Sequence, residues 1–279
     1  MSGFQELFGD LRSLVNQEQP DGKAIWKILK TMAKASPDRF KAEVVEGYLP
    51  AFIPRLSSPL HVCNSLKELE DVCTILSLPV FMLSLSQHEI GDEGVKALAA
   101  SPHLSHLTTL YIVWNEIGVD GARAIANSPH LSHLTTLKLN GNNLGVEGAK
   151  ELANSPRMSN LRTLKLSDNQ IGVEGARVLA QSHYLSNLIE LDLSSNNLGV
   201  EGVKALANSP GLSHLFWLNL SYNKIGVEGA RALAKSPYLS QLTALHLDGN
   251  EIGVEGARAL TESPHLNYLT HLGIDLEDE

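Results

Sequence analysis

The chain has 279 residues, a formal net charge of −9 and two cysteines. The acidic balance disfavours nucleic acid as a partner, because nucleic-acid-binding proteins present a basic face. No apolar run reaches the roughly 18 residues of a membrane-spanning helix, so no membrane partner is expected. The two cysteines, Cys63 and Cys73, are too few for a disulfide framework. We interpret them as buried thiols, with a single bridge as the alternative.

Residues 1–79 do not repeat, and their apolar residues fall at helical spacing. The pattern predicts four amphipathic helices, the last of which opens at the capping-box sequence Ser65-Leu-Lys-Glu68. Because the first repeat of a solenoid needs its apolar flank covered, we predict that residues 1–79 form an α-helical N-terminal cap. The alternative is a catalytic or ligand-binding helical module, with the repeats as its targeting arm. No basic segment followed by an apolar core opens the chain, so no cleavable signal peptide is expected.

Residues 80–279 repeat with a period of 27 residues and no insertions. A period in this range indicates a solenoid, in which each repeat packs on its neighbours. The pattern predicts eight strands and seven full repeats. One leucine marks every strand, at positions 83, 110, 137, 164, 191, 218, 245 and 272.

Within one repeat, Leu137 and Leu139 alternate with polar residues, which predicts a short strand with one buried face. Asn142 follows at a fixed offset, and its amide can bond the backbone where the chain leaves the sheet. A turn at Leu144-Gly145 then leads to a short helix over residues 147–153, which ends at Ser155-Pro156. The glycine at 148 returns in every full repeat, so we expect a packing or backbone requirement for it.

The pattern L-x-x-L-x-L-x-x-N-x-(I/L)-G, followed by a helix, resembles the leucine-rich repeat. The helical second half resembles the ribonuclease-inhibitor-like class, and runs such as Gly-Val-Glu-Gly-Ala-Arg are similar to those of bacterial leucine-rich repeat proteins, including exported effectors. The resemblance implies an α/β solenoid, or horseshoe, with a concave parallel sheet and convex helices. It also implies protein binding.

Several residue groups resemble chemical sites without completing one. His103/His106 and His130/His133 have a spacing seen in metal sites, but other residues hold the same loop positions in other repeats. Asp168 and Asp192 lie on neighbouring predicted strands, but no positioned third group accompanies them. No glycine pattern follows the order of a dinucleotide site. The sequence therefore predicts no metal, no cofactor and no enzymatic activity.

The predicted helices carry an acidic residue three positions before a basic one, as in Glu147 and Lys150. Residues at this spacing are neighbours on a helix, so we expect ion pairs and a solvated, self-neutralising convex face. The same pair is expected in all seven repeats: 93/96, 120/123, 147/150, 174/177, 201/204, 228/231 and 255/258.

The positions that point outward from the predicted strands vary freely between repeats, whereas the core positions barely change. They include two aromatic clusters with charged residues between them. Exposed tryptophan and tyrosine on a rigid surface are typical of interface anchors; scattered surface aromatics are the alternative. The predicted partner-binding residues are Tyr111, Val113, Trp114, Lys138, Lys165, Asp168, Glu190, Asp192, Trp217, Tyr222, His246 and Asp248.

These observations favour a non-enzymatic protein–protein interaction module that binds a protein on its concave face. The acidic C-terminal residues 275–279 discourage pairing between strand edges, so a monomer is expected. A cytoplasmic location is expected. The alternative is a bacterial effector that reaches a host cell without a cleavable signal peptide.

Overall fold

The computed structural model describes residues 6–7, 10, 31 and 82–275. The chain divides into two compact units, residues 1–85 and 86–279. The predicted helical cap falls almost entirely outside the described residues. The state of Cys63 and Cys73 and the acidic segment 276–279 also lie outside them.

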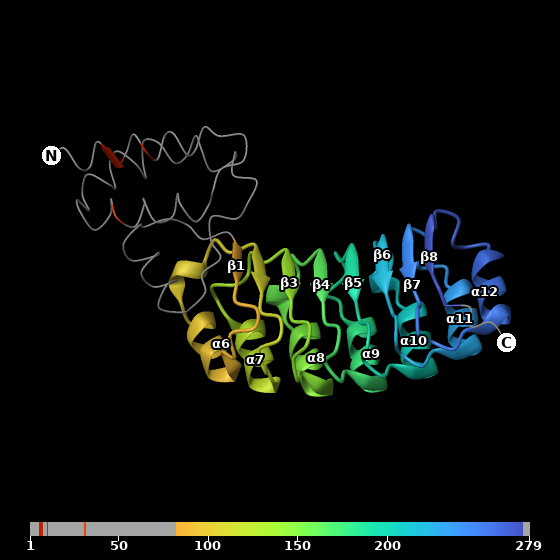
Figure 1. Cartoon of the computed structure of the whole chain (residues 1–279), viewed down its shortest axis with the longest axis horizontal. Coiled ribbons are helices and arrows are strands. Elements are labelled where there is room, and N and C mark those ends of the chain that lie inside the picture. Colours follow the sequence, from red (N-terminus) through yellow and green to blue (C-terminus); the bar gives the residue numbers. More distant parts are fainter. Residues whose placement is uncertain (1–5, 8–9, 11–30, 32–81, 276–279) are drawn as a thin grey trace. The chain divides into compact units, whose positions relative to one another are not determined.

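Eight short strands form one sheet, in which neighbours in the chain are neighbours in space (Figure 1). From Leu110 onward the register aligns each strand leucine with the next, as in Leu137 with Leu164, and these pairings are parallel. The strands are β1 (Met82–Ser84), β2 (Thr109–Tyr111), β3 (Thr136–Lys138), β4 (Thr163–Lys165), β5 (Glu190–Asp192), β6 (Trp217–Asn219), β7 (Ala244–His246) and β8 (His271–Gly273).

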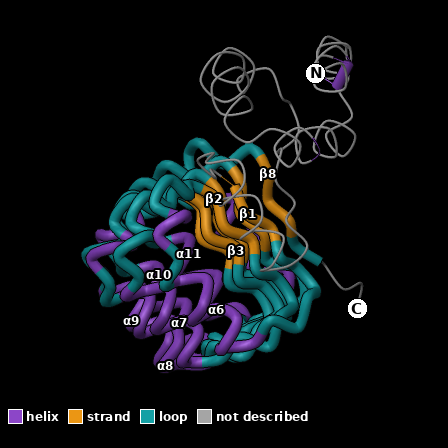
Figure 2. The backbone as a smooth tube through the Cα atoms, turned by 90° about the vertical axis from the view of Figure 1, so that its left-hand side faces the viewer, coloured by secondary structure: helices purple, strands orange, loops and turns teal. Residues whose placement is uncertain are grey.

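Seven α-helices follow the first seven strands and line the opposite side of the repeats, with loops closing both ends (Figure 2). Leucine, isoleucine and alanine side chains between the two layers are buried. The α/β solenoid predicted for the repeats is therefore confirmed. The helices are α6 (Gly91–Ala99), α7 (Val119–Asn127), α8 (Gly145–Ala153), α9 (Gly172–Gln181), α10 (Gly199–Ala207), α11 (Gly226–Ala234) and α12 (Gly253–Thr261), with 3-10 turns η3 (Pro102–Leu104), η4 (Pro156–Met158) and η5 (Pro210–Leu212).

A ladder of buried asparagines joins successive repeats. Oδ1 of Asn142 accepts hydrogen bonds from the N–H groups of Asn115 and Ile117 in the preceding repeat, both at 3.0 Å. Its Nδ2 donates to the carbonyl of Leu139 at 2.8 Å in its own repeat and to that of Ile112 at 2.9 Å in the preceding one. The predicted backbone role of this asparagine is confirmed, and the structure adds that the amide bridges two repeats. Equivalent bonds to the preceding repeat come from Asn169, Asn196, Asn223 and Asn250.

A second ladder, made of serine hydroxyls, runs along the other end of the repeats. Ser155 Oγ donates to the carbonyl of Ala126 in the preceding repeat at 2.5 Å and accepts from the N–H of Arg157 at 3.2 Å. The serine therefore ends its own helix and fixes the end of the previous one, whereas the sequence indicated only the first role. The same bond to the preceding repeat, at 2.5–2.6 Å, comes from Ser128, Ser182, Ser209, Ser236 and Ser263.

The repeated helix glycine meets a packing requirement, as predicted. A Cβ at Gly175 would overlap the side chain of Ile171 and lie 3.5 Å from Ala149 in the preceding helix. A Cβ at Gly256 would lie 2.5 Å from Ile252 and 3.0 Å from Ala230. The absence of a side chain at this position lets successive helices approach closely.

The predicted i,i+3 ion pairs form in six of the seven helices, for example between Lys204 and Glu201 at 2.7 Å. The hydrogen bond from Lys204 lowers the pKa of the exposed Glu201 carboxyl. The prediction is wrong for α12, where Arg258 pairs with Glu262 at 2.9 Å. Glu255 is drawn away because Arg231 of the preceding repeat reaches it.

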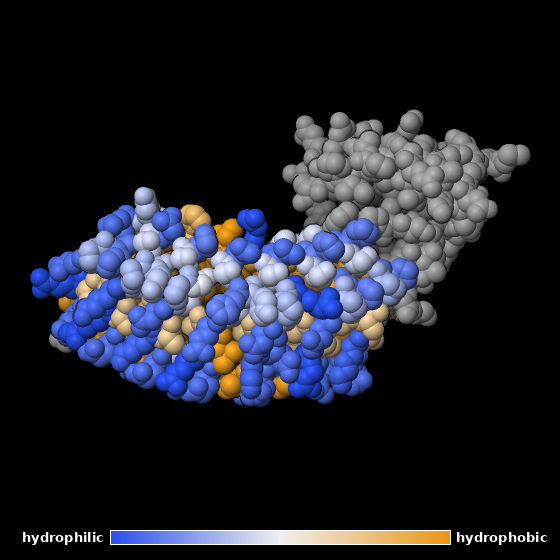
Figure 3. Space-filling view, turned by 180° about the vertical axis from the view of Figure 1, so that it is seen from behind, coloured by the Kyte–Doolittle hydropathy of each residue, from blue (hydrophilic) through white to orange (hydrophobic). Residues whose placement is uncertain are grey.

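Ion pairs between neighbouring helices, such as Arg123 with Glu151 at 2.9 Å, add lateral contacts that the sequence did not predict. Charged and polar side chains cover most of the described surface seen in Figure 3, with apolar side chains in narrow strips. Within the described part of the chain, no helix is both long and apolar enough to cross a membrane.

We expect Asn142→Ala to lower the free energy of unfolding by at least about 3 kcal/mol. The change leaves backbone donors and acceptors of two repeats buried and unpaired, at about 1–3 kcal/mol each. Denaturant unfolding of the intact chain measures the loss. Asn143→Ala is the matched control: Asn143 is exposed, and its replacement should change stability by no more than about 0.5 kcal/mol. Equal losses of unfolding free energy for the two substitutions would contradict a stabilising role for the asparagine ladder.

Candidate functional site

We define the strand face as the side chains on either side of each strand leucine together with the two residues at which the chain leaves the strand. In β2 these are Thr109, Tyr111, Val113 and Trp114. All twelve predicted partner-binding residues lie on this face, because the parallel register places equivalent positions side by side. Their assignment to partner binding stays a prediction, and the contacts below show which of them the fold brings together.

Both lysines of the strand face stack on aromatic rings. Nζ of Lys138 lies 4.2 Å from the ring centroid of Tyr111 on the neighbouring strand. Nζ of Lys165 lies 4.3 Å from the ring centroid of Trp217, two strands away, and 3.8 Å from a carboxylate oxygen of Glu190 on the strand between. An ammonium over an aromatic face is attracted by the ring quadrupole, typically by about 0.5–2 kcal/mol. The strand face therefore already binds cations within its own chain.

Two imidazoles continue the stack of Lys165 on Trp217, so that a row of contacting side chains crosses the last three strands. The Trp217 and His246 rings have centroids 5.3 Å apart, and His246 and His271 have centroids 4.9 Å apart, both in tilted orientations. Trp217 is consequently only partly exposed, since Lys165 and His246 both contact it. We expected Trp217 to be exposed, whereas it is half-buried at the centre of a packed row; its role as an anchor stays a prediction. His271 was not among the predicted residues, because its role depends on stacking with its neighbour.

Trp114 and Tyr222 are the exposed rings of the strand face, with exposed fractions of 53% and 62%. Each lies over a glycine of the next repeat: a Cβ at Gly141 would overlap the Trp114 ring, and a Cβ at Gly249 would overlap the Tyr222 ring. One face of each ring is thus packed on backbone, while the other is open to solvent. The sequence signal for this arrangement is an aromatic residue followed, 27 positions later, by glycine.

The backbone of Trp114 and Tyr222 themselves is also in an unusual conformation. Trp114 has φ of 56° and Tyr222 has φ of 58°, in the left-handed region. The fold imposes this conformation at the second exit position of each strand, where residues 87, 141, 168, 195 and 249 also have φ between 54° and 66°. A left-handed conformation costs a residue with a side chain about 1–2 kcal/mol. Large aromatic residues therefore sit where the backbone favours glycine.

The carboxylates of the strand face differ in availability. Asp192 is 8% exposed and accepts hydrogen bonds from the N–H and Oγ of Ser194, so it is a buried, satisfied group. Its predicted exposure to a partner is therefore wrong. Asp168 is exposed and Asp248 is half-buried. Asp275, which the sequence prediction left out, accepts a hydrogen bond from the N–H of Gly249 at 3.1 Å, which places its carboxylate beside the glycine that carries the Tyr222 ring.

Charge is unevenly distributed along the strand face. Its only lysines, Lys138 and Lys165, are on β3 and β4. From β5 to β8 the same positions hold no lysine or arginine, and their carboxylates are Glu190, Asp192, Asp248 and Asp275. Of these, Asp192 is buried and Glu190 lies near Lys165, so Asp248 and Asp275 are the carboxylates that suit a cationic group beside the aromatic rings of the last strands.

No group of three or more histidine, cysteine, aspartate or glutamate side chains suited to a metal ion occurs within the described residues. The histidines that sequence spacing brought to attention, such as His103 and His106, lie in and beside the turn η3.

The chain matches the family model described as Leucine Rich repeat. The seven matched segments are residues 83–99, 103–126, 130–153, 157–180, 184–207, 212–234 and 239–260. Together they cover more than half of the chain. A search of curated proteins finds no match.

We expect Gly141→Ala to displace the Trp114 ring, because the new methyl group would occupy the space of that ring. Gly145→Ala is the control: Gly145 has φ of 59°, close to the 66° of Gly141, but no atom lies within 4 Å of its would-be Cβ. Both substitutions add backbone strain, but only the new methyl group at position 141 would also overlap an aromatic ring. Fluorescence of Trp114, in a background with Trp26 and Trp217 replaced by phenylalanine, should shift with Gly141→Ala alone. The same shift in both variants would contradict ring packing on glycine.

Proposed function

Because the chain belongs to the leucine-rich repeat family, we propose that it is a non-enzymatic protein–protein interaction module whose strand face binds a protein partner. Leucine-rich repeats generally serve as protein-interaction modules and are typically not enzymes. The observation that carries the proposal is the pair of exposed aromatic rings, Trp114 and Tyr222, held flat on glycine backbone.

The fold itself does not require an aromatic residue at this position. Other repeats place glutamine, aspartate, serine or glycine there with the same left-handed backbone. The aromatic residues at 114 and 222 therefore add exposed apolar area without completing the core. Tyrosine and tryptophan are also the side chains most enriched among residues that dominate binding energy.

The spacing of the rings suits a protein partner. Trp114 and Tyr222 leave strands β2 and β6, which are four strand intervals apart. At about 4.8 Å per interval, the rings are roughly 19 Å apart along the sheet. A surface of that length is compatible with a standard protein interface, which buries about 800 Å² on each partner.

The charge distribution favours a partner with lysine or arginine opposite the last strands. Asp275 and the Tyr222 ring both lie against Gly249, so a cationic side chain there would meet a carboxylate and an aromatic face together. The internal contact between Lys165 and Trp217 is an example of the same chemistry within the chain. We propose that the partner presents a basic segment to β5–β8 and an apolar one to Trp114.

We further propose that the protein is a monomer, because the carboxylate of Asp275 adds negative charge beside the edge strand β8. We also propose a cytoplasmic location. The helical second half of each repeat supports membership of the ribonuclease-inhibitor-like class, and the helix run Gly-Val-Glu-Gly-Ala-Arg, as at 172–177, supports similarity to bacterial proteins. Export into a host cell is the alternative location, and a translocation reporter fused to the chain distinguishes the two.

We expect peptides selected on the intact chain from a random phage-displayed library to be rich in lysine and arginine. Trp114→Ser combined with Tyr222→Ser should weaken their binding by more than about 2 kcal/mol, or about 30-fold, if the rings are anchors. Calorimetry with the synthetic peptides measures the change, and unfolding curves establish that the variant is folded.

The matched control for the aromatic substitutions is Tyr184→Ser combined with Phe216→Ser. These rings are 39% and 45% exposed but lie outside the strand face. Peptide affinity should be unchanged in this variant. The proposal would be contradicted if the control variant lost more peptide affinity than the strand-face variant. It would also be contradicted if the selected peptides were acidic rather than basic.

A further inference from the structure

The repeat array departs from its own pattern at one place. Six repeats follow the ladder serine with proline, and only the fourth has another residue, His183. Helix α9 before it is also longer by one residue and ends at Gln181. The next position carries a planar side chain in six repeats, namely His103, His130, Arg157, Tyr184, Tyr238 and His265, and the exception there is Gly211.

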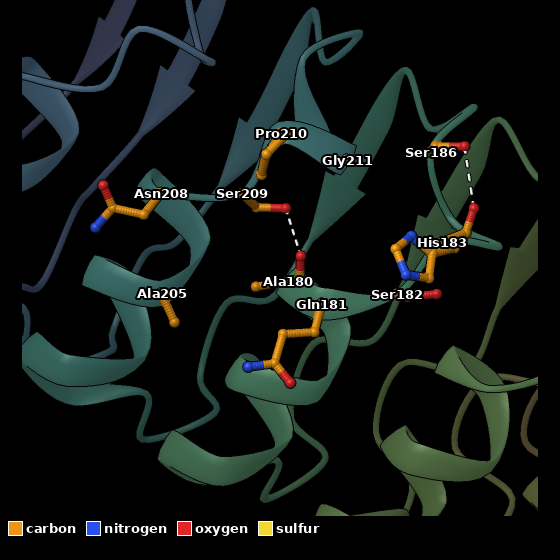
Figure 4. A pocket seen from close by; sticks show the side chains of 10 residues that line it. All are labelled: Ala180, Gln181, Ser182, His183, Ser186, Ala205, Asn208, Ser209, Pro210 and Gly211. Atoms are coloured by element: carbon orange, nitrogen blue, oxygen red, sulfur yellow. Dashed lines mark hydrogen bonds between the residues drawn. The ribbon is translucent and has the colours of Figure 1, made fainter.

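A pocket of about 640 Å³ lies at this irregularity, between the ends of α9 and α10 (Figure 4). Its volume is within the range of about 300–1,000 Å³ that is typical of ligand sites. His183 and Gly211, which are both departures from the repeat pattern, line it. The hydroxyl of Ser209 donates a hydrogen bond to the carbonyl of Ala180, and both residues line the pocket.

The missing side chain at position 211 explains the pocket. A Cβ on Gly211 would point toward the carbonyl oxygen of Ser182, at 3.3 Å, which is also part of the lining. A side chain at this position would therefore enter the pocket. In the following repeat the equivalent Tyr238 is half-buried. The hollow at Gly211 is thus a place where the following repeat carries a planar, half-buried side chain of its own.

The lining defines the chemistry of an occupant. Ala180, Ala205 and Pro210 supply apolar surface, while Gln181, His183 and Asn208 supply amide and imidazole groups. The lining contains no lysine, arginine, aspartate or glutamate. An uncharged ring with one hydrogen-bonding group fits such a site better than a guanidinium, which would lack a carboxylate partner.

We propose that this pocket is a second binding site, separate from the strand face, which takes the phenol ring of a tyrosine presented by a protein partner. Tyrosine is the group that the array itself places at this position in the two adjacent repeats, as Tyr184 and Tyr238. The partner's ring substitutes for the side chain that Gly211 lacks, and its hydroxyl bonds a polar group of the lining.

The test uses 4-methylphenol as the probe and the intact chain labelled with nitrogen-15. Titration should shift the amide signals of Gln181, His183 and Gly211 to saturation in the millimolar range. Gly211→Tyr fills the pocket with the residue found at 184 and 238, so it should keep the fold and weaken binding at least about tenfold, or 1.4 kcal/mol. Arg157→Tyr, which places the same residue at the equivalent position two repeats away, should leave binding unchanged.

Three results would overturn the proposal: no saturable shift in the unaltered chain, equal binding to a correctly folded Gly211→Tyr variant, or toluene binding as tightly as 4-methylphenol. The last would show that the polar groups of the pocket do not recognise a hydroxyl. Peptides bound at the strand face should bind Gly211→Tyr with unchanged affinity, so failure here is distinguishable from failure of the proposed function.

Discussion

The structure depends on hydrogen bonds that each repeat makes to the backbone of the repeat before it. Asn142 satisfies N–H and carbonyl groups of two repeats at the strand exit, and Ser155 does the same at the helix end. An unpaired buried backbone group costs about 1–3 kcal/mol, so a single repeat cut from the array would leave several such costs uncompensated. Stability therefore accumulates along the array, as in other one-dimensional repeat proteins.

The same constraint decides where function can reside. The ladders occupy the two bends of each repeat, and leucine, alanine and glycine occupy the space between sheet and helices. The strand face takes no part in these contacts and is free to vary. It carries the exposed rings of Trp114 and Tyr222, whose underlying glycines replace a side chain with a flat backbone surface. The scaffold thus presents aromatic groups in fixed positions with little conformational entropy left to lose on binding.

Much of the fold was predictable because the sequence carries the strand pattern eight times and the helix pattern seven times. Leucine spacing predicted all eight strands, and the asparagine and helix glycine were assigned correct roles. Interactions that cross repeats were harder to predict: Ser155 was assigned only to its own helix, and Arg231 captures Glu255 from the predicted partner Arg258. On the strand face, periodicity identified the outward positions, but not that Lys165 reaches Trp217 two strands away or that Ser194 buries Asp192. Those outcomes depend on side-chain length and rotamer, which position in a repeat does not determine.

Hydrogen exchange of the intact chain, measured alone and saturated with a selected peptide, tests the account most directly. The backbone N–H groups that donate to ladder asparagines should exchange among the slowest in both states. They are those of Asn115, Asn169, Asn196 and Asn223. Slowing caused by the peptide should fall at residues 109–114 and 217–222, while α7 and α10 stay unchanged. Fast exchange at the ladder amides, or peptide protection confined to the helices, would contradict the view that lateral ladders build the scaffold and the strand face binds.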